Sequence, residues 1–314
     1  MSKHWFNQPE YGSLLAIKLL LGITAVLGRS VTRLLLYPTC LYFMLRAPSA
    51  TRASRQYLAR VLDRRPRWRE IFRHYFTFAS VLLDRAIFQS GRTGQLAIGC
   101  TNLELMSELS AQHRGALLLS AHFGSIDIIG KIDTMQPHAR ISMLMYENNA
   151  RMIQALFDSL GGRRRIQVIP IGRVDTLIRA KEQLDVGGWV GVLGDRVMPG
   201  DRQIRVPFLG ETAAFPAGPF LAASALKVPV VLFVGAYLGG NRYQEHFELL
   251  AEEISIGRHT QEADLEHWVR RYAERLEHYC RTYPYNWFNF YDFWEPARAP
   301  LPATRPRRLA RSAA

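Results

Sequence analysis

Cysteine is scarce in this sequence: the 314 residues contain only Cys40, Cys100 and Cys280. These three stand far apart and form no Cys-x-x-Cys or Cys/His cluster, which argues against a structural zinc site. An odd, dispersed set also argues against a disulfide framework and fits a reducing compartment. We therefore expect no metal, no other cofactor and no catalytic cysteine.

Long apolar runs are also missing. The two longest near the start span 14–27 and 34–45, are separated by Arg29 and Arg33, and fall short of the roughly 20 residues that a spanning helix needs. Joining them into one span would bury both arginines at a high cost. Two short apolar helices with cations between them suit the membrane interface, so residues 1–50 are predicted to form an interfacial helical anchor. The alternative is a helical hairpin packed on the domain.

Acidic residues are few: 27 Asp and Glu face 40 Lys and Arg, a formal charge of +13. This balance favours anionic partners, namely nucleic acid, anionic lipid, phosphorylated substrates or an acidic carrier protein. Nucleic acid is not expected, because no RNA- or DNA-binding motif is present. A cluster of arginines interleaved with aromatic residues predicts contact with an anionic membrane surface, the alternative being a solvated helix face: Arg52, Arg55, Arg60, Arg64, Arg65, Arg67, Arg69 and Arg73.

The rest of the chain alternates between strand and helix patterns. Helices are expected over 51–95, with a break at Pro66, and an amphipathic helix over 262–281. This alternation predicts one α/β domain over 51–296, with a mainly parallel central sheet flanked by helices. The tail, 297–314, is basic and aperiodic and is predicted to be disordered. The patterns between these helices are strands at 116–121, 141–146, 166–171, 189–193 and 228–237, and helices at 147–160, 175–184 and 219–226.

The sharpest local motif is the sequence from His122 to Asp127, directly after a buried strand. Catalytic groups gather at the carboxyl ends of strands in open α/β sheets. A neutral imidazole there can take a proton from a hydroxyl while a carboxylate fixes its tautomer, provided that Gly124 lets the chain turn. The alternative is a purely structural role, with the histidine capping a turn and Asp127 at a helix N-terminus. A serine hydrolase is disfavoured, because Ser120 and Ser125 stand in no G-x-S-x-G motif.

Two glycine- and arginine-rich loops are candidates for substrate binding. The first, 161–165, contains Arg163, and the second, 194–210, follows a predicted strand on the same sheet edge as the histidine. Arginines suit phosphate and carboxylate groups through forked hydrogen bonds. The alternative is a solvated loop with surface salt bridges. The candidate residues of the second loop are Asp195, Arg196 and Arg202.

The ordered set of motifs resembles the bacterial lipid A late acyltransferase family, the lauroyl and myristoyl transferases, over about residues 10–295. The resemblance implies a glycerolipid-acyltransferase-like fold and an O-acyltransferase at the cytoplasmic face of the inner membrane. The donor would be an acyl thioester of acyl carrier protein, and the acceptor a hydroxyl of a glycolipid or similar lipid. His122 would be the general base and Asp127 its partner. The motifs are the His122–Asp127 sequence, Gly162-Arg163, Gly194-Asp195-Arg196, 206–210, 216–219 and 228–230.

The C-terminal aromatic sequence departs from that family. Where the family commonly has a basic pair after a tryptophan, Trp287 is followed by Phe-Asn-Phe-Tyr-Asp-Phe and Trp294. This resembles relatives from aryl-polyene lipid pathways, so the expected acceptor is a lipid other than lipid A. The aromatic run is expected to be a core strand or a lipid-facing belt. The alternatives for function are a non-catalytic lipid-binding protein and a lipid esterase or thioesterase.

Overall fold

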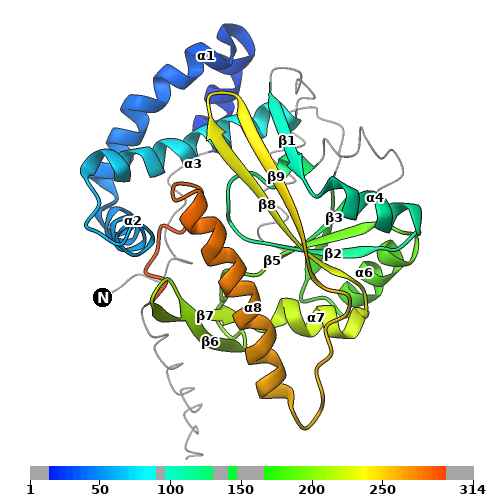
Figure 1. Cartoon of the computed structure of the whole chain (residues 1–314). Coiled ribbons are helices and arrows are strands. Elements are labelled where there is room, and N and C mark those ends of the chain that lie inside the picture. Colours follow the sequence, from blue (N-terminus) through cyan, green and yellow to red (C-terminus); the bar gives the residue numbers. More distant parts are fainter. Residues whose placement is uncertain (1–13, 90–95, 130–140, 147–165, 295–314) are drawn as a thin grey trace, which may run out of the picture.

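A seven-stranded sheet forms the centre of the described part of the chain (Figure 1). The computed structural model describes residues 14–89, 96–129, 141–146 and 166–294. The strand order is β1-β9-β8-β2-β5-β3-β4, and every neighbouring pair except β8 and β9 is parallel. The strands are β1 (Ala97–Thr101), β2 (Ala116–Ser120), β3 (Ile141–Tyr146), β4 (Ile166–Ile171), β5 (Trp189–Leu193), β8 (Val230–Gly239) and β9 (Arg242–Ala251).

The central strands are apolar throughout because both faces of the sheet are covered. In β2 all five residues are buried. Leu117 and Leu119 pack in one core cluster, with Leu276 of helix α8 (Gln261–Thr282). Leu118 packs in the other, with Leu109 of helix α4 (Leu103–Ala111). The predicted α/β class with a mainly parallel sheet is therefore confirmed.

A separate antiparallel hairpin, β6 (Gln203–Phe208) and β7 (Glu211–Pro216), lies beside helix α8. Neither of its strands was predicted from the sequence, nor were β1 and β9. The helices are α1 (Leu14–Arg46), α2 (Pro48–Val61), α3 (Trp68–Gln89), α4 (Leu103–Ala111), α6 (Thr176–Asp185), α7 (Gly218–Leu226) and α8 (Gln261–Thr282).

Helix α1 joins the core instead of standing apart from it. Its regular conformation is interrupted at Gly28, where φ is 78°, and it continues through Pro38. Leu36 and Cys40 are buried in the main core cluster, and α1 packs against α3. An apolar N-terminal anchor is therefore not shown. Within the described ranges, no helix is long and apolar enough to cross a membrane.

The division of the chain into an anchor at 1–50, a domain at 51–296 and a tail at 297–314 stays a prediction. Residues 295–314 lie outside the described residues, as does the helix expected at 147–160. The helix expected at 175–184 corresponds to α6, and the one at 262–281 to α8. The break expected at Pro66 separates α2 from α3.

Candidate active site

His122 and Asp195 meet because two neighbouring parallel strands end at the same level. β2 pairs with β5 so that Ser120 lies opposite Leu193. His122 and Asp195 each follow two residues later in their own chain segment. Parallel register therefore brings an imidazole and a carboxylate side by side at the carboxyl edge of the sheet, where ligand sites of such sheets occur.

The carboxylate of Asp195 receives three hydrogen bonds. His122 donates from its ring Nδ1 to Oδ1 at 2.8 Å and from its backbone N–H to Oδ2 at 3.0 Å. The indole Nε1 of Trp287 donates to Oδ2 at 3.0 Å. The Asp195 side chain is only 1% exposed, and a buried carboxylate is stable only when it is paired in this way.

The pKa values of this pair are lowered from their usual positions. Burial alone would raise the pKa of Asp195, but His122, its hydrogen bonds and the charge of Arg196 outweigh burial and lower it to about 2. Burial lowers the pKa of His122, the cations Arg196 and Arg85 lower it further, and Asp195 partly opposes them. The site therefore holds a neutral imidazole beside an ionised carboxylate at neutral pH.

The ring of His122 keeps one nitrogen as a proton acceptor. Because Nδ1 carries the proton donated to Asp195, Nε2 keeps its lone pair. No described residue bonds to Nε2, and the side chain is 30% exposed. An imidazole that a carboxylate orients, and whose Nε2 no described residue occupies, can act as a general base.

The backbone around His122 is fixed by a C-terminal segment. Phe288 donates its N–H to the carbonyl of His122 at 2.7 Å, and Gly124 donates its N–H to the carbonyl of Asn286 at 2.8 Å. Gly124 has a φ of +52°, and a Cβ there would lie 1.9 Å from the carbonyl oxygen of Gly235. The turn expected at Gly124 is present, and its close approach to β8 leaves room only for glycine.

Trp287 is held in place by a second, buried histidine. His74 on α3 donates from Nε2 to the carbonyl oxygen of Trp287 at 2.9 Å, and its Nδ1 is 2.8 Å from the hydroxyl of Ser54 on α2. Burial lowers the pKa of His74 to about 4, so the ring is neutral. The indole makes edge contacts with the rings of Tyr57 and Phe208. Polar contacts from α2 and α3 thus fix the backbone of Trp287, whose indole in turn donates to Asp195.

The aromatic sequence after Trp287 lies in the core as irregular structure. Trp287 is fully buried, and Phe288 and Phe293 are nearly so. Residues 287–294 form no strand, only an isolated bridge between Trp287 and Phe123. Of the two expectations, core strand and lipid-facing belt, the core position is confirmed and the strand is wrong.

Asp127 lies in the site with a different partner from the one expected. Its Oδ2 is 3.0 Å from Nε of Arg85, and its side chain is 9% exposed. The hydrogen bond to the ring Nδ1 of His122, which the sequence interpretation assigned to Asp127, is made by Asp195. Arg85 is near enough to lower the pKa of His122, so Asp127 partly offsets a cation beside the base.

The predicted substrate-binding residues separate into three groups. Asp195 and Arg196 lie at the imidazole, and Arg196 donates to the carbonyl of Phe288 at 3.0 Å and lies 5.9 Å from the ring centre of Tyr291. Arg202 instead donates to Gln261 and forms an ion pair with Glu262, both at the start of α8. Arg163 lies outside the described residues.

Sequence reasoning missed the supporting residues of the site. Trp287 was noticed only as a family departure, and Arg85 and His74 were not singled out. Tyr146, at the end of β3, donates its hydroxyl to Asp201 at 2.9 Å, which ties the loop after β5 to the neighbouring strand. These links join segments far apart in sequence, and no local pattern indicates them.

The chain was also compared with known proteins. A family model described as bacterial lipid A biosynthesis acyltransferase matches residues 3–295, which is most of the chain. No curated protein matches the chain.

Proposed function

The chain belongs to the bacterial lipid A biosynthesis acyltransferase family, and we propose that it transfers a fatty acyl group from an acyl thioester to a hydroxyl of a lipid-like acceptor. The family implies an acyltransferase with an acyl donor and a lipid acceptor. The roles of individual residues are our proposal. One observation carries it: His122 donates from Nδ1 to the buried Asp195 at 2.8 Å, and its Nε2, on a side chain that is 30% exposed, has no hydrogen bond to any described residue.

The proposed reaction is a direct transfer. Nε2 of His122 takes the proton of the acceptor hydroxyl while the oxygen forms a bond to the thioester carbonyl carbon. The carbon–sulfur bond then breaks, and the imidazolium returns its proton to the leaving thiolate. Asp195 fixes the reactive tautomer and stabilises the imidazolium, which exists only after the hydroxyl proton has been taken.

Arg196 is proposed to stabilise the oxyanion of the tetrahedral intermediate. Its charge lowers the pKa of His122, which indicates that the guanidinium lies close to the ring. Its hydrogen bond to the carbonyl of Phe288 fixes its direction. A cation already oriented where negative charge develops costs little reorganisation during the reaction.

Asp127 is proposed to act through Arg85. Without its carboxylate, Arg85 would be an uncompensated cation near His122 and would weaken the imidazole as a base. Asp127 then remains part of the site, as the sequence motif suggests, but as a positioning residue behind Arg85.

The donor is proposed to be an acyl carrier protein thioester, and the acceptor a glycolipid-like molecule other than lipid A. The formal charge of +13 suits an acidic carrier protein. The aromatic sequence after Trp287 packs on the core, and the family commonly has a basic pair there. This difference supports an acceptor with less anionic charge at that position. We also propose that the enzyme works at the cytoplasmic face of the bacterial inner membrane.

The deciding experiment compares His122→Ala with His259→Ala. The second variant removes an exposed histidine from the loop before α8 and serves as the matched control. The donor is acyl carrier protein loaded with a radiolabelled acyl group, and the acceptor comes from a bacterial lipid extract. His122→Ala is expected to lose about 10³-fold or more of the transfer rate, and the control is expected to keep the wild-type rate. Full activity of a folded His122→Ala protein would refute the assignment. Free fatty acid released without acceptor would identify a thioesterase instead, and vesicle binding without transfer a lipid-binding protein.

A further inference from the structure

A cleft lies between α1, α3 and the tip of the β8–β9 hairpin, and none of the residues described at the His122 site lines it. Its volume is about 520 Å³. Figure 1 shows α1 and α3 beside this end of the hairpin. Its charged and aromatic lining residues are Arg29, Arg33, Tyr37 and Phe76, with Leu34 and Gly240 beside them.

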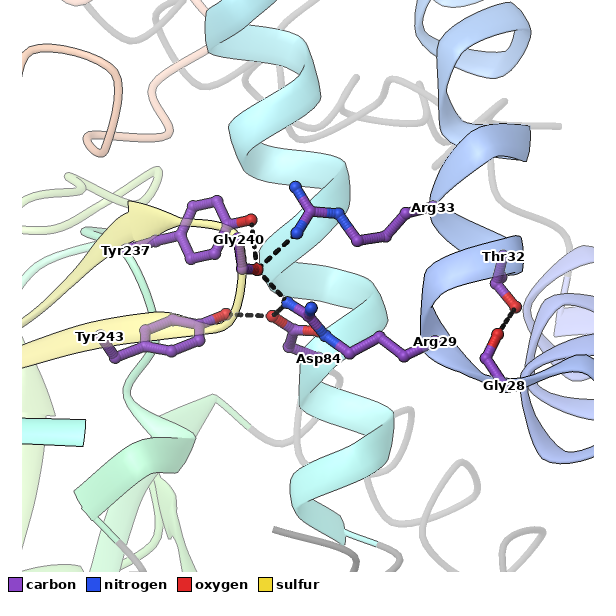
Figure 2. A network of polar contacts seen from close by, with 8 residues as sticks. All are labelled: Gly28, Arg29, Thr32, Arg33, Asp84, Tyr237, Gly240 and Tyr243. Atoms are coloured by element: carbon purple, nitrogen blue, oxygen red, sulfur yellow. Dashed lines mark hydrogen bonds and ion pairs between the residues drawn. The ribbon is translucent and has the colours of Figure 1, made fainter. Parts of the chain in front are cut away.

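One of the two arginines is already neutralised. Arg29 pairs with the fully buried Asp84 through Nε to Oδ1 at 2.6 Å and Nη2 to Oδ2 at 2.7 Å (Figure 2). Tyr243 donates its hydroxyl to the same carboxylate at 2.7 Å. Arg29 and Asp84 therefore form a fixed, uncharged support for the cleft.

The second arginine keeps its charge. Arg33 forms no ion pair with any described residue; its one hydrogen bond goes to the carbonyl oxygen of Gly240. That oxygen also receives Nη2 of Arg29 at 2.5 Å and the hydroxyl of Tyr237 at 3.1 Å (Figure 2). Three donors share one oxygen with two lone pairs, while a guanidinium carries five N–H groups. The cleft therefore has an excess of donors and a net charge of +1, the complement of a phosphate group.

An apolar stripe on α1 begins at this cleft. Leu34, Tyr37, Leu41 and Leu45 follow one another at spacings of three and four residues, so they share one helix face. All four are exposed, Leu34 by 65% and Leu45 by 70%. The stripe is about 16 Å long. A row of exposed apolar side chains next to a cation that no described carboxylate compensates is the pattern of an interfacial membrane contact.

We propose that this cleft binds the phosphate of an anionic membrane phospholipid, with Arg33 as the main contact and the α1 stripe inserted into the acyl layer. The positive charge of the cleft favours a phosphate group as its ligand. The adjoining apolar stripe favours a phosphate that belongs to a lipid in a bilayer. The proposal goes beyond the acyl transfer and does not depend on it.

The test measures sedimentation of the full chain with vesicles, using phosphatidylglycerol mixed with phosphatidylcholine against phosphatidylcholine alone. Arg33→Gln is compared with Arg258→Gln, which removes an exposed arginine from the loop before α8. Arg33→Gln is expected to weaken binding to the anionic vesicles about fivefold or more, and Arg258→Gln less than about twofold. Circular dichroism confirms that both variants are folded.

A second variant tests the stripe. Leu41→Ser with Leu45→Ser is expected to weaken binding to both kinds of vesicle, because it removes apolar contact and leaves the charge. His122→Ala is expected to bind vesicles like the wild type, so failure of the catalytic proposal leaves this one standing. Equal effects of Arg33→Gln and Arg258→Gln would overturn it. The proposal would also be overturned if Arg33→Gln abolished the binding of inorganic phosphate but left vesicle binding unchanged. The site would then bind a soluble anion.

Discussion

Replacing Asp195 by asparagine removes the charge behind the proposed base and keeps the shape of the side chain. In the wild-type protein the pKa of the Asp195 carboxyl is about 2 instead of the ordinary 3.8. That difference corresponds to about 2 kcal/mol of preference for the ionised form in the folded protein. This contribution is complete above pH 3.8 and is lost as the pH falls toward 2. At neutral pH the variant is expected to lose up to about 2 kcal/mol of unfolding free energy.

The effect on catalysis should be larger than the effect on stability. The amide cannot stabilise an imidazolium, and its NH₂ group facing Nδ1 would drive the ring proton to Nε2, where the lone pair is needed. We expect the transfer rate to fall about 10³- to 10⁴-fold, the scale known for the same change in serine protease triads. The assay is single-turnover transfer from acyl carrier protein, with urea unfolding measured on the same preparation.

Asp127→Asn is the matched control, because it changes the other carboxylate at the site. It leaves Arg85 without its ion-pair partner and lowers the pKa of His122 further. A loss of roughly tenfold is expected, and Arg85→Gln in the same chain should restore part of it. If Asp195→Asn stayed within tenfold of wild type, or lost less than Asp127→Asn, the assignment of the base's partner would be refuted.

Three further variants probe the surroundings of the site. Arg196→Gln should move the pH–rate profile to higher pH, because it removes a cation that lowers the pKa of His122; a shift to lower pH would contradict the assignment. Trp287→Phe removes a hydrogen bond to the buried Asp195, so kcat should fall more than KM rises. Urea unfolding should show that the free energy of unfolding falls by about 1.5–3 kcal/mol. Unchanged values would oppose this role. Gly124→Ala places a Cβ 1.9 Å from a backbone oxygen of β8, so we expect at least about 3 kcal/mol of destabilisation, and a wild-type melting curve would count against the described turn.

The sheet was predictable because its central strands are buried on both faces. Such strands read as short apolar runs, and β2, β3, β4 and β5 were each found within a residue of their bounds. The hairpin of β6 and β7 was missed although Leu209 and Gly210, both with positive φ, form its turn. Its alternating pattern was interpreted as an arginine-rich loop.

The sequence indicated the main residues of the site but not the contacts between them. His122 stands out because it directly follows a buried strand, and Asp195 was singled out by its neighbouring arginine. Their contact depends on the register of β2 against β5, which neither strand specifies alone. Counting two residues beyond each strand end would have indicated the pair. The contact between Asp127 and Arg85 joins a turn to a long helix, and nothing in either segment predicts it.

The N-terminal helix shows how tertiary contacts decide where a helix is interrupted. Proline inside a helix usually kinks or breaks it, yet α1 continues through Pro38 and departs from helical geometry at Gly28. Gly28 has a φ of 78°, which glycine adopts without strain. The next residue, Arg29, is the one that reaches the buried Asp84, so this break sets the direction of α1 where it meets the core.

The central claim is that His122 is neutral at pH 7, with its proton on Nδ1 and its lone pair on Nε2. Nitrogen-15 NMR of histidine-labelled protein measures this directly, and comparison with His122→Ala assigns the signals. We predict a protonated Nδ1, an unprotonated Nε2 and a pKa below the ordinary 6.5. A ring that carries its proton on Nε2, or is cationic at pH 7, would contradict the account.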